Sequence, residues 1–430
     1  CKTQAVTGLW CVCHRLALAC AGANNTVKYV TLVETNLRQL WSLFENSNKK
    51  TAIYVKVQMN MKSLNSTPKT RSKVTRKVKK ACRTRWLSLG KAVKSLHQDY
   101  AAVLTTLKVL DDEQHDAAAK GLFMRLNTFK FIATTYILNR LIPILDLVSK
   151  SFQKGSVTFS HIAPNLAYAK AKLKEEALSH KAIHDAVQDL KPNGRLSVQG
   201  VEVQVTECGL VEVDNLLHRY VAALTQHLDE RFQESLPLFS LFSIFDPSLL
   251  PAVDSTEFSE YGKGEISDIG KIYVPNRIPE VVAEFELFKF HMAKFKIPEP
   301  SKLVGETQTE VVLKKLVHMK LLFPLLSLFA EAILSLPISN AWPERGGSAI
   351  KRIKTRLRSR LSNKMLESLL HISINGPEIC TEEKVFVSTV QPCQGSQGIH
   401  MQENRANKPL SDILELQVTS KNRQNNRLCR

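Results

Sequence analysis

The spacing of apolar residues along the chain predicts a protein built mostly of helices. Within residues 26–44 the apolar side chains recur every three or four positions, at Val30, Val33, Leu37, Leu40 and Phe44. This period places them on one face of an α-helix. The same period continues over residues 87–148 and returns over residues 214–245. We therefore expect several long helices that share a common core.

Three segments break this helical pattern. Residues 191–209 combine a proline, glycines and alternating valines, which predicts a loop or a short hairpin between two helical blocks. Residues 251–279 are bounded by prolines, and we expect a turn-rich connector there. Residues 378–430 are polar and rich in Gln and Asn, a composition that predicts a disordered tail.

The C-terminal helices are expected over residues 281–295 and 310–336, followed by a basic helix that ends near Ile374. A glycine and a proline close this last helix, Gly376 and Pro377. The longest apolar stretch, residues 321–338, is interrupted by one acid and two prolines, Glu331, Pro324 and Pro337. A membrane span would bury that charge and lose helix hydrogen bonds in lipid. We therefore expect a buried helix and no membrane partner.

The charge of the chain changes this picture by suggesting a partner. Lys and Arg total 59 against 40 Asp and Glu, so the net charge is +19 and the pI is near 9.5. Such a balance favours a polyanion over a small neutral ligand, so we expect no small-molecule substrate. Nucleic acid is the first candidate partner, and an anionic membrane surface is the second.

The basic residues are densest over residues 69–85, which hold nine Lys or Arg in seventeen positions. Several phosphate contacts would make binding here fall steeply with salt. Trp86 could stack on an unpaired base beside them, because an aromatic face accepts any base. The candidate DNA-binding residues are Lys77, Lys79, Lys80, Arg83, Arg85 and Trp86. The alternatives are a solvated loop or a nuclear import signal, with Trp86 as a core anchor.

The nine cysteines are odd in number and scattered, unlike a secreted disulfide framework, so we expect a reducing compartment. Four potential zinc ligands lie close together in sequence: Cys11, Cys13, His14 and Cys20. They lack a matching second pair at finger spacing. We interpret the cysteines as small core residues and predict no metal and no cofactor.

The motif that points to a family lies in residues 336–378, after the apolar stretch LLFPLLSLFAEAILS. A Pro-x-Ser-x-Ala turn is followed by Glu-Arg and a serine, and its residues are Pro337, Ser339, Ala341, Glu344, Arg345 and Ser348. This segment resembles the C-terminal dimerisation region of hAT transposases. Gly347 stands where that family usually has Phe, which removes an aromatic packing group and weakens the helix.

Two shorter motifs support the resemblance and extend it over about residues 10–378. Cys11 and His14, followed by RLALA, are similar to the family's Cys-x-x-His motif. Residues 83–88 are similar to its Thr-Arg-Trp signature. The runs ERGGSAIKRIKTRLRSRL and LFSIFDPSLLP suggest similarity to domesticated vertebrate members of the family.

The resemblance implies a fold and a domain order. The expected fold class is mostly α, with the remnant of a ribonuclease-H-like α/β core interrupted by a large helical insertion. Residues 1–83 would be the truncated core segment with a basic linker, and residues 84–300 the helical insertion. Residues 301–377 would be the dimerisation region, and residues 378–430 the tail.

Catalysis by such a core needs two divalent ions held by three carboxylates. Glu344 matches the family's third acid, whereas the two aspartates should lie on strands before Cys11. The residues before Cys11 contain no acid, and the first aspartate in the chain is Asp99. We therefore expect no enzymatic activity, with Glu344 as a vestigial acid in a favourable first-turn helix position.

Dimerisation is the activity that the resemblance implies for residues 321–374. The expected contacts are apolar residues of the two C-terminal helices: Leu325, Leu326, Phe329, Ile333, Leu334, Ile353, Leu357 and Leu361. Burial within the same chain is the alternative for these side chains. The second helix also carries a basic surface for DNA or an acidic partner, formed by Lys351, Arg352, Lys354, Arg356, Arg358, Arg360 and Lys364.

These expectations combine into a nuclear, non-catalytic, transposase-derived homodimer with DNA as a candidate partner. One alternative is a fragment of an active hAT DNA transposase whose catalytic aspartates lie upstream of this chain. Another is a degraded gene product without a selected function.

Overall fold

The structure is a computed structural model that describes the larger part of the chain, namely residues 11–65, 77–81, 86–153, 159–191, 196, 203–299, 307–336, 339, 341–358 and 360–375. The predicted disordered tail, 378–430, lies outside these residues. The described part is mostly helical, as the apolar periods predict, and contains no strand. The α/β core that the resemblance implies is therefore not seen there, and helices make up most of the described part of residues 1–83.

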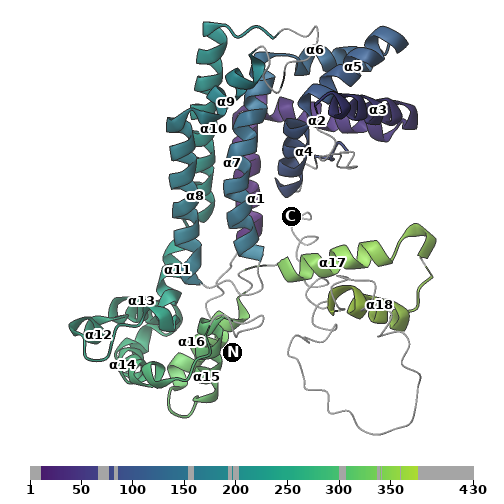
Figure 1. Ribbon diagram of the computed structural model, residues 1–430. Helices are drawn as coiled ribbons and strands as arrows, with labels where there is room; N and C mark the ends of the chain where they lie inside the picture. The colour runs from purple at the N-terminus through teal and green to yellow at the C-terminus, as the bar shows by residue number, and fades with distance from the viewer. Residues whose placement is uncertain are drawn as a thin grey trace, which may run out of the picture.

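The N-terminal helices are α1 (Val12–Thr26), α2 (Lys28–Glu45) and α3 (Asn48–Asn65). Helix α2 confirms the period predicted over residues 26–44, because the five apolar residues of that period are buried: Val30, Val33, Leu37, Leu40 and Phe44. It packs against α3 and α6 (Ala117–Leu126), and α3 packs against α5 (Tyr100–Gln114). Together with α4 (Trp86–Gln98), helices α2 and α3 lie at one end of the molecule, at the upper right of Figure 1.

The middle of the chain forms α4 (Trp86–Gln98), α5 (Tyr100–Gln114), α6 (Ala117–Leu126) and α7 (Phe129–Gln153). Helix α7 is the one described helix that is long and apolar enough to cross a membrane. Most of its apolar residues are buried within the protein, where it packs against α1, α4, α8, α9 and α10. Such burial is typical of a core helix.

A bundle of long helices surrounds α7, formed by α8 (Phe159–Ser179), α9 (Lys181–Leu190) and α10 (Glu207–Phe232). Figure 1 shows α1, α7, α8 and α10 running side by side. The 26 residues of α10 span about 39 Å at 1.5 Å per residue. Most of the predicted loop 191–209 lies outside the described residues, and α10 already begins at Glu207.

Helix α1 is tied to α10 by buried polar contacts as well as by apolar packing. The Tyr220 hydroxyl donates to Asn24 Oδ1 at 2.7 Å, where both side chains are buried. The Arg15 guanidinium donates to the Arg231 carbonyl near the far end of α10. Because an unpaired polar group would be costly there, these partners fix how the two helices align.

A second helical block follows α10 and lies at the lower left of Figure 1. It contains the following helices: α11 (Leu236–Phe242), η2 (Ser243–Phe245), η3 (Pro247–Leu249), α12 (Thr256–Glu260), α13 (Lys263–Tyr273), η4 (Pro275–Arg277) and α14 (Ile278–Lys294). The predicted connector over residues 251–279 was wrong, since α12 and α13 lie there. Three buried side chains, Phe258, Ile266 and Ile269, hold these short helices on the core. Helices α12 and α13 are too short for their apolar residues to show a clear helical period in the sequence.

The helix predicted over residues 281–295 is the single helix α14, whereas the last two predicted helices are each divided. Residues 310–336 form α15 (Gln308–His318) and α16 (Pro324–Ser335), because Pro324 has no amide hydrogen and begins a new helix. The basic segment forms α17 (Ala341–Ile353), η6 (Arg356–Arg358) and α18 (Asn363–Asn375). Helices α15 and α16 complete the second block, whereas α17 and α18 pair with each other.

Candidate dimerisation region and nucleic-acid surface

Helix α16 contributes most of its predicted dimer contacts to the core of its own chain. Leu325, Leu326, Phe329 and Ile333 are at most 3% exposed, and Leu334 is half-buried. The helix packs against α14 and α15, and the buried Ser327 hydroxyl donates to the carbonyl of Leu316 at 2.9 Å. The four buried side chains stabilise the helix that an interface would use, but they are not accessible for direct contact with a partner.

The start of α16 is held by a carboxylate from α14. Glu284 accepts hydrogen bonds from the backbone amides of Leu325 and Leu326, each at 3.0 Å. The first amides of a helix have no partner within the helix and carry partial positive charge. An anionic acceptor therefore satisfies them, and it fixes where α16 begins relative to α14.

Three leucines around the start of α16 are left on the surface, and we call them the α16 patch: Leu321, Leu322 and Leu328. Leu321 is fully exposed, and Leu322 is 49% exposed. Neighbouring apolar residues on a soluble surface indicate a contact with another molecule more often than isolated ones do. The α16 patch, which includes two residues just before the helix, is therefore the apolar surface at α16 that is available to a partner.

Helices α17 and α18 form a hairpin with a small core separate from the main one. Ala349, Ile353 and Leu370 are its buried residues, and five half-buried side chains pack around them, namely Ile350, Leu361, Leu366, Leu369 and Ile374. Two of the predicted contacts, Ile353 and Leu361, thus lie inside the hairpin. So small a core is a weak source of stability for two helices. The side chains of Leu357 and Glu344 lie outside the described residues.

The outer side of α18 exposes two further apolar residues, which we call the α18 face: Met365 and Ile372. They are 52% and 67% exposed. They are seven positions apart, so they lie two turns apart on the same side of the helix. The hairpin is therefore apolar on its inner side and also, in part, on its outer side.

The basic surface predicted on this hairpin is present. All seven of its Lys and Arg residues between positions 351 and 364 are exposed. The described residues place no carboxylate in an ion pair with any of the seven, so their positive charges add. Two copies would repel each other if these surfaces met, which favours pairing through apolar side chains instead.

The N-terminal motif does not gather a set of metal ligands. Cys11 and Cys20 are buried, whereas His14 is exposed. The Cys13 thiol donates to the carbonyl of Phe152 at 3.2 Å. Burial raises the pKa of the Cys20 thiol, which opposes the thiolate that a metal requires.

Part of the predicted DNA-binding segment is described and is exposed. Lys77, Lys79 and Lys80 all face solvent, while Ala81 is buried beside them. The Ser95 hydroxyl of α4 donates to the Lys77 carbonyl at 3.0 Å, which fixes this stretch on the bundle. The three ammonium groups are thus held on one short, anchored segment.

An aromatic residue that the sequence reasoning did not select lies next to this segment. The Lys80 ammonium lies 4.4 Å from the centre of the half-buried Trp41 ring, on α2. Trp41 sits 39 positions earlier in the chain, so no local motif indicated it. Arg83, Arg85 and the side chain of Trp86 lie outside the described residues, and their predicted roles stay predictions.

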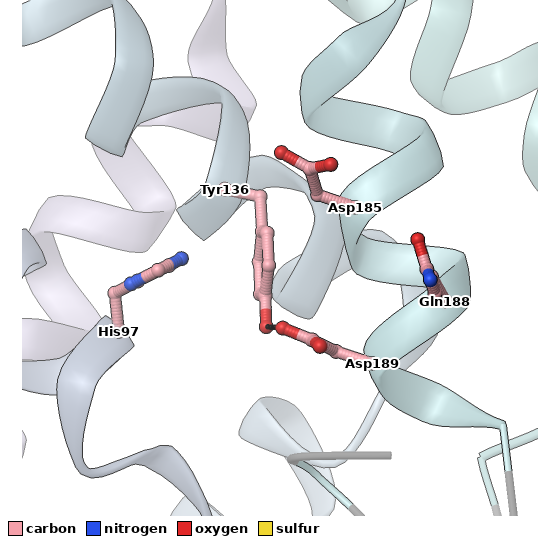
Figure 2. Close-up of a pocket in the computed structure, with 5 residues that line it drawn as sticks. All are labelled: His97, Tyr136, Asp185, Gln188 and Asp189. Atoms are coloured by element: carbon pink, nitrogen blue, oxygen red, sulfur yellow. Dashed lines mark hydrogen bonds between the residues drawn. The ribbon is translucent and has the colours of Figure 1, made fainter.

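A pocket between α4, α7 and α9 was also not expected from the sequence. Figure 2 shows its lining residues, His97, Tyr136, Asp185, Gln188 and Asp189. The Tyr136 hydroxyl donates to Asp189 Oδ2 at 2.6 Å, and the His97 ring lies edge-on to Tyr136 at 4.4 Å. With two carboxylates on its wall, the pocket disfavours a phosphate, so it does not extend the basic surface.

Comparison with known protein families gives a match over the region from the end of α14 to the end of α18. Residues 294–375 match the model of the hAT family C-terminal dimerisation region. The match overlaps the range 301–377 expected from the sequence, and it includes the α16 patch and the α17–α18 hairpin. Residues 294–375 of this protein therefore form a region of the hAT C-terminal dimerisation type.

Proposed function

We propose that this protein acts by forming a homodimer through the α16 patch and the α18 face. The observation that carries the proposal is the hairpin of α17 and α18, whose own core, among the described side chains, has three buried apolar residues, while its outer side exposes Met365 and Ile372. A second copy could cover that side and supply the burial that the hairpin lacks. The family match to residues 294–375 supports self-association as the role of this region.

Two double variants test the proposed interface: Met365→Glu/Ile372→Glu on the α18 face and Leu321→Glu/Leu322→Glu on the α16 patch. Because each places carboxylates where the dimer would exclude water, the dissociation constant should rise by roughly 100-fold. Light scattering or sedimentation at several protein concentrations measures the mass. The original residues are exposed, so the monomer should keep its helical circular dichroism spectrum.

The matched control is Met124→Glu/Leu178→Glu, whose residues are 66% and 74% exposed and lie on α6 and α8. It adds the same charge outside the proposed interface and should leave the dimer intact. A monomer mass of the unchanged protein at every concentration would sink the dimer proposal. A dimer that tolerates both test variants would remove these two surfaces from it.

Nucleic acid is the proposed partner of the anchored lysines. The exposure of Lys77, Lys79 and Lys80, together with Trp41 beside Lys80, supports contacts to phosphates and stacking on a base. Replacing all three lysines by alanine should weaken binding and lower the slope of log K against log salt by about 2–3. Fluorescence anisotropy of a labelled oligonucleotide across a salt series measures both.

The control for this test changes three lysines of α8, Lys170, Lys172 and Lys174, to alanine. Lys170 and Lys172 are already paired with Asp229 and Glu175, so less free positive charge is lost. This variant should keep the salt slope nearly unchanged. An equal effect of both triple variants would point to a general charge effect rather than to a binding segment.

We also propose that the dimer is non-catalytic and nuclear. One structural detail supports the first of these two proposals. Asp99, the first aspartate in the chain, accepts hydrogen bonds from Tyr54 and Gln58 at the junction of α3 and α5. These contacts give it a structural role. The alternative is a fragment of an active hAT DNA transposase. A mass of the endogenous protein above 48.4 kDa would favour it, and fluorescence microscopy would test the nuclear location.

A further inference from the structure

The upper part of the helical bundle brings together two histidines and an aspartate from separate elements. His180 lies at the corner between α8 and α9, whereas Asp214 and His218 lie one turn apart on α10. His180 Nδ1 is 2.8 Å from Asp214 Oδ1, and His218 Nε2 is 3.8 Å from the same oxygen. One ligand atom from each residue lies within 4.8 Å of the others. No other such group of three or more occurs in the described part of the chain.

The central oxygen of this group is short of a hydrogen-bond donor. Asp214 Oδ1 is shielded from solvent, and it accepts no well-aligned hydrogen bond even though His180 Nδ1 is so close. A desolvated carboxylate oxygen without a well-aligned donor is unfavourable. Two imidazole nitrogens that converge on such an oxygen leave a position where a cation would satisfy all three groups.

The backbone turns sharply at His180, between α8 and α9. His180 has φ of +50°, in the left-handed region that few residues other than glycine adopt. The buried neighbours Ala182 and Ile183 fix the start of α9 on the core. The corner therefore presents His180 towards α10 at a conformational cost, as functional positions often do.

We propose that His180, Asp214 and His218 form a binding site for Zn²⁺. Two imidazoles and one carboxylate are a common ligand set for zinc, with bonds of about 2.0–2.2 Å. Tetrahedral ligand atoms then lie roughly 3.3 Å apart, between the 2.8 and 3.8 Å found here. The three residues are 38–50% exposed, so small side-chain movements suffice, and water can complete the coordination. The ion would fasten the α8–α9 corner to α10.

The test titrates the purified full-length chain, first stripped with a chelator, with Zn²⁺ in competition with a coloured chelator. The variants are His180→Asn, which tolerates the left-handed backbone, Asp214→Asn and His218→Gln. Each should lose one equivalent of Zn²⁺ or bind it at least about tenfold more weakly. His184→Ala is the control, because His184 is exposed one turn further along α9. It should bind like the unchanged protein.

Two further measurements separate this site from the cysteines and from misfolding. Co²⁺ in place of Zn²⁺ should give visible absorption without the near-ultraviolet bands of thiolate ligands. Zn²⁺ should raise the melting temperature of the unchanged protein and of His184→Ala, but not of the three ligand variants. Equal Zn²⁺ stoichiometry and affinity in the unchanged protein and all ligand variants would overturn the proposal, as would a purely thiolate Co²⁺ spectrum. The dimer proposal does not depend on either result.

Discussion

Replacing Lys289 by alanine is expected to lower the free energy of unfolding by roughly 3–5 kcal/mol. Lys289 is a fully buried lysine on α14. Its ammonium donates to the carbonyls of Phe258 at 2.8 Å and Ser259 at 3.0 Å. These carbonyls lie in the last turn of α12, where the helix itself supplies no amide donors for its carbonyl oxygens.

The buried charge of Lys289 is compensated on several sides. Glu286, one turn earlier on α14, lies 3.2 Å from the ammonium. The rings of Phe258 and Phe285 lie 5.2 and 6.0 Å from it. Truncation would leave two buried carbonyls without donors and a cavity beside two rings, and both effects destabilise the fold.

Urea denaturation followed by circular dichroism measures this loss. Lys289→Met keeps most of the apolar stem, so its cost isolates the lost hydrogen bonds and should exceed about 2 kcal/mol. Lys294→Ala, at an exposed lysine of the same helix, is the control and should change stability by less than about 0.5 kcal/mol. If the two lysine-to-alanine variants were equally stable, the buried network would contribute nothing.

Replacing Gly262 by alanine is the second large effect, with an expected loss of roughly 2–6 kcal/mol. Gly262 caps the start of α13 with φ of +74°, a conformation that is strained for other residues. A β-carbon there would also lie 2.5 Å from Cε1 of Phe285. Phe285 is fully buried and stacks edge-on with Phe245 at 6.2 Å, so its ring has little room to move.

A neighbouring glycine provides the control for this substitution. Gly264 lies on α13 itself, and a β-carbon there would meet nothing within 4 Å. Gly264→Ala should keep or raise stability by up to about 1 kcal/mol, because alanine favours a helix. Thermal unfolding of the two variants side by side measures the contrast. Equal melting temperatures would show that neither the backbone conformation nor Phe285 restricts position 262.

Both substitutions should also affect the dimerisation region, because both loosen the packing of α14. Lys289 and Phe285 lie on this helix, and so does Glu284, which holds the first amides of α16. Loosening α14 would therefore release the helix that positions the α16 patch. We expect the Gly262 and Lys289 variants to weaken dimerisation only at temperatures or urea concentrations at which the second helical block begins to open.

The sequence by itself determined the helical class and the position of the dimerisation region. The period of Val30, Val33 and Leu37 is a local property, because neighbouring residues alone decide which side of a helix is apolar. The turn and acid–arginine motif around Pro337 and Glu344 is also local, and it located the region that the family match covers. The surplus of 19 positive charges needed only a count.

The tertiary structure decided which apolar side chains are left for a partner. Leu325 and Leu328 are three residues apart in one apolar run, yet one is buried and the other is exposed. A period gives the apolar side of a helix but not how much of it the neighbouring helices cover, which depends on α14 and α15. The α/β core expected from the resemblance was likewise not seen in the described residues, where helices take its place.

The candidate sites also depended on contacts between distant parts of the chain. Trp41 contacts Lys80, and His180 lies close to Asp214, which is also near His218. Trp41 and Lys80, like His180 and Asp214, are too far apart in the sequence for a local motif to indicate their contact. The spacing of Asp214 and His218 was readable as one helical turn, but their partner at the α8–α9 corner was not. Such pairings are set by the packing of whole helices, because the buried apolar faces fix which surface residues become neighbours.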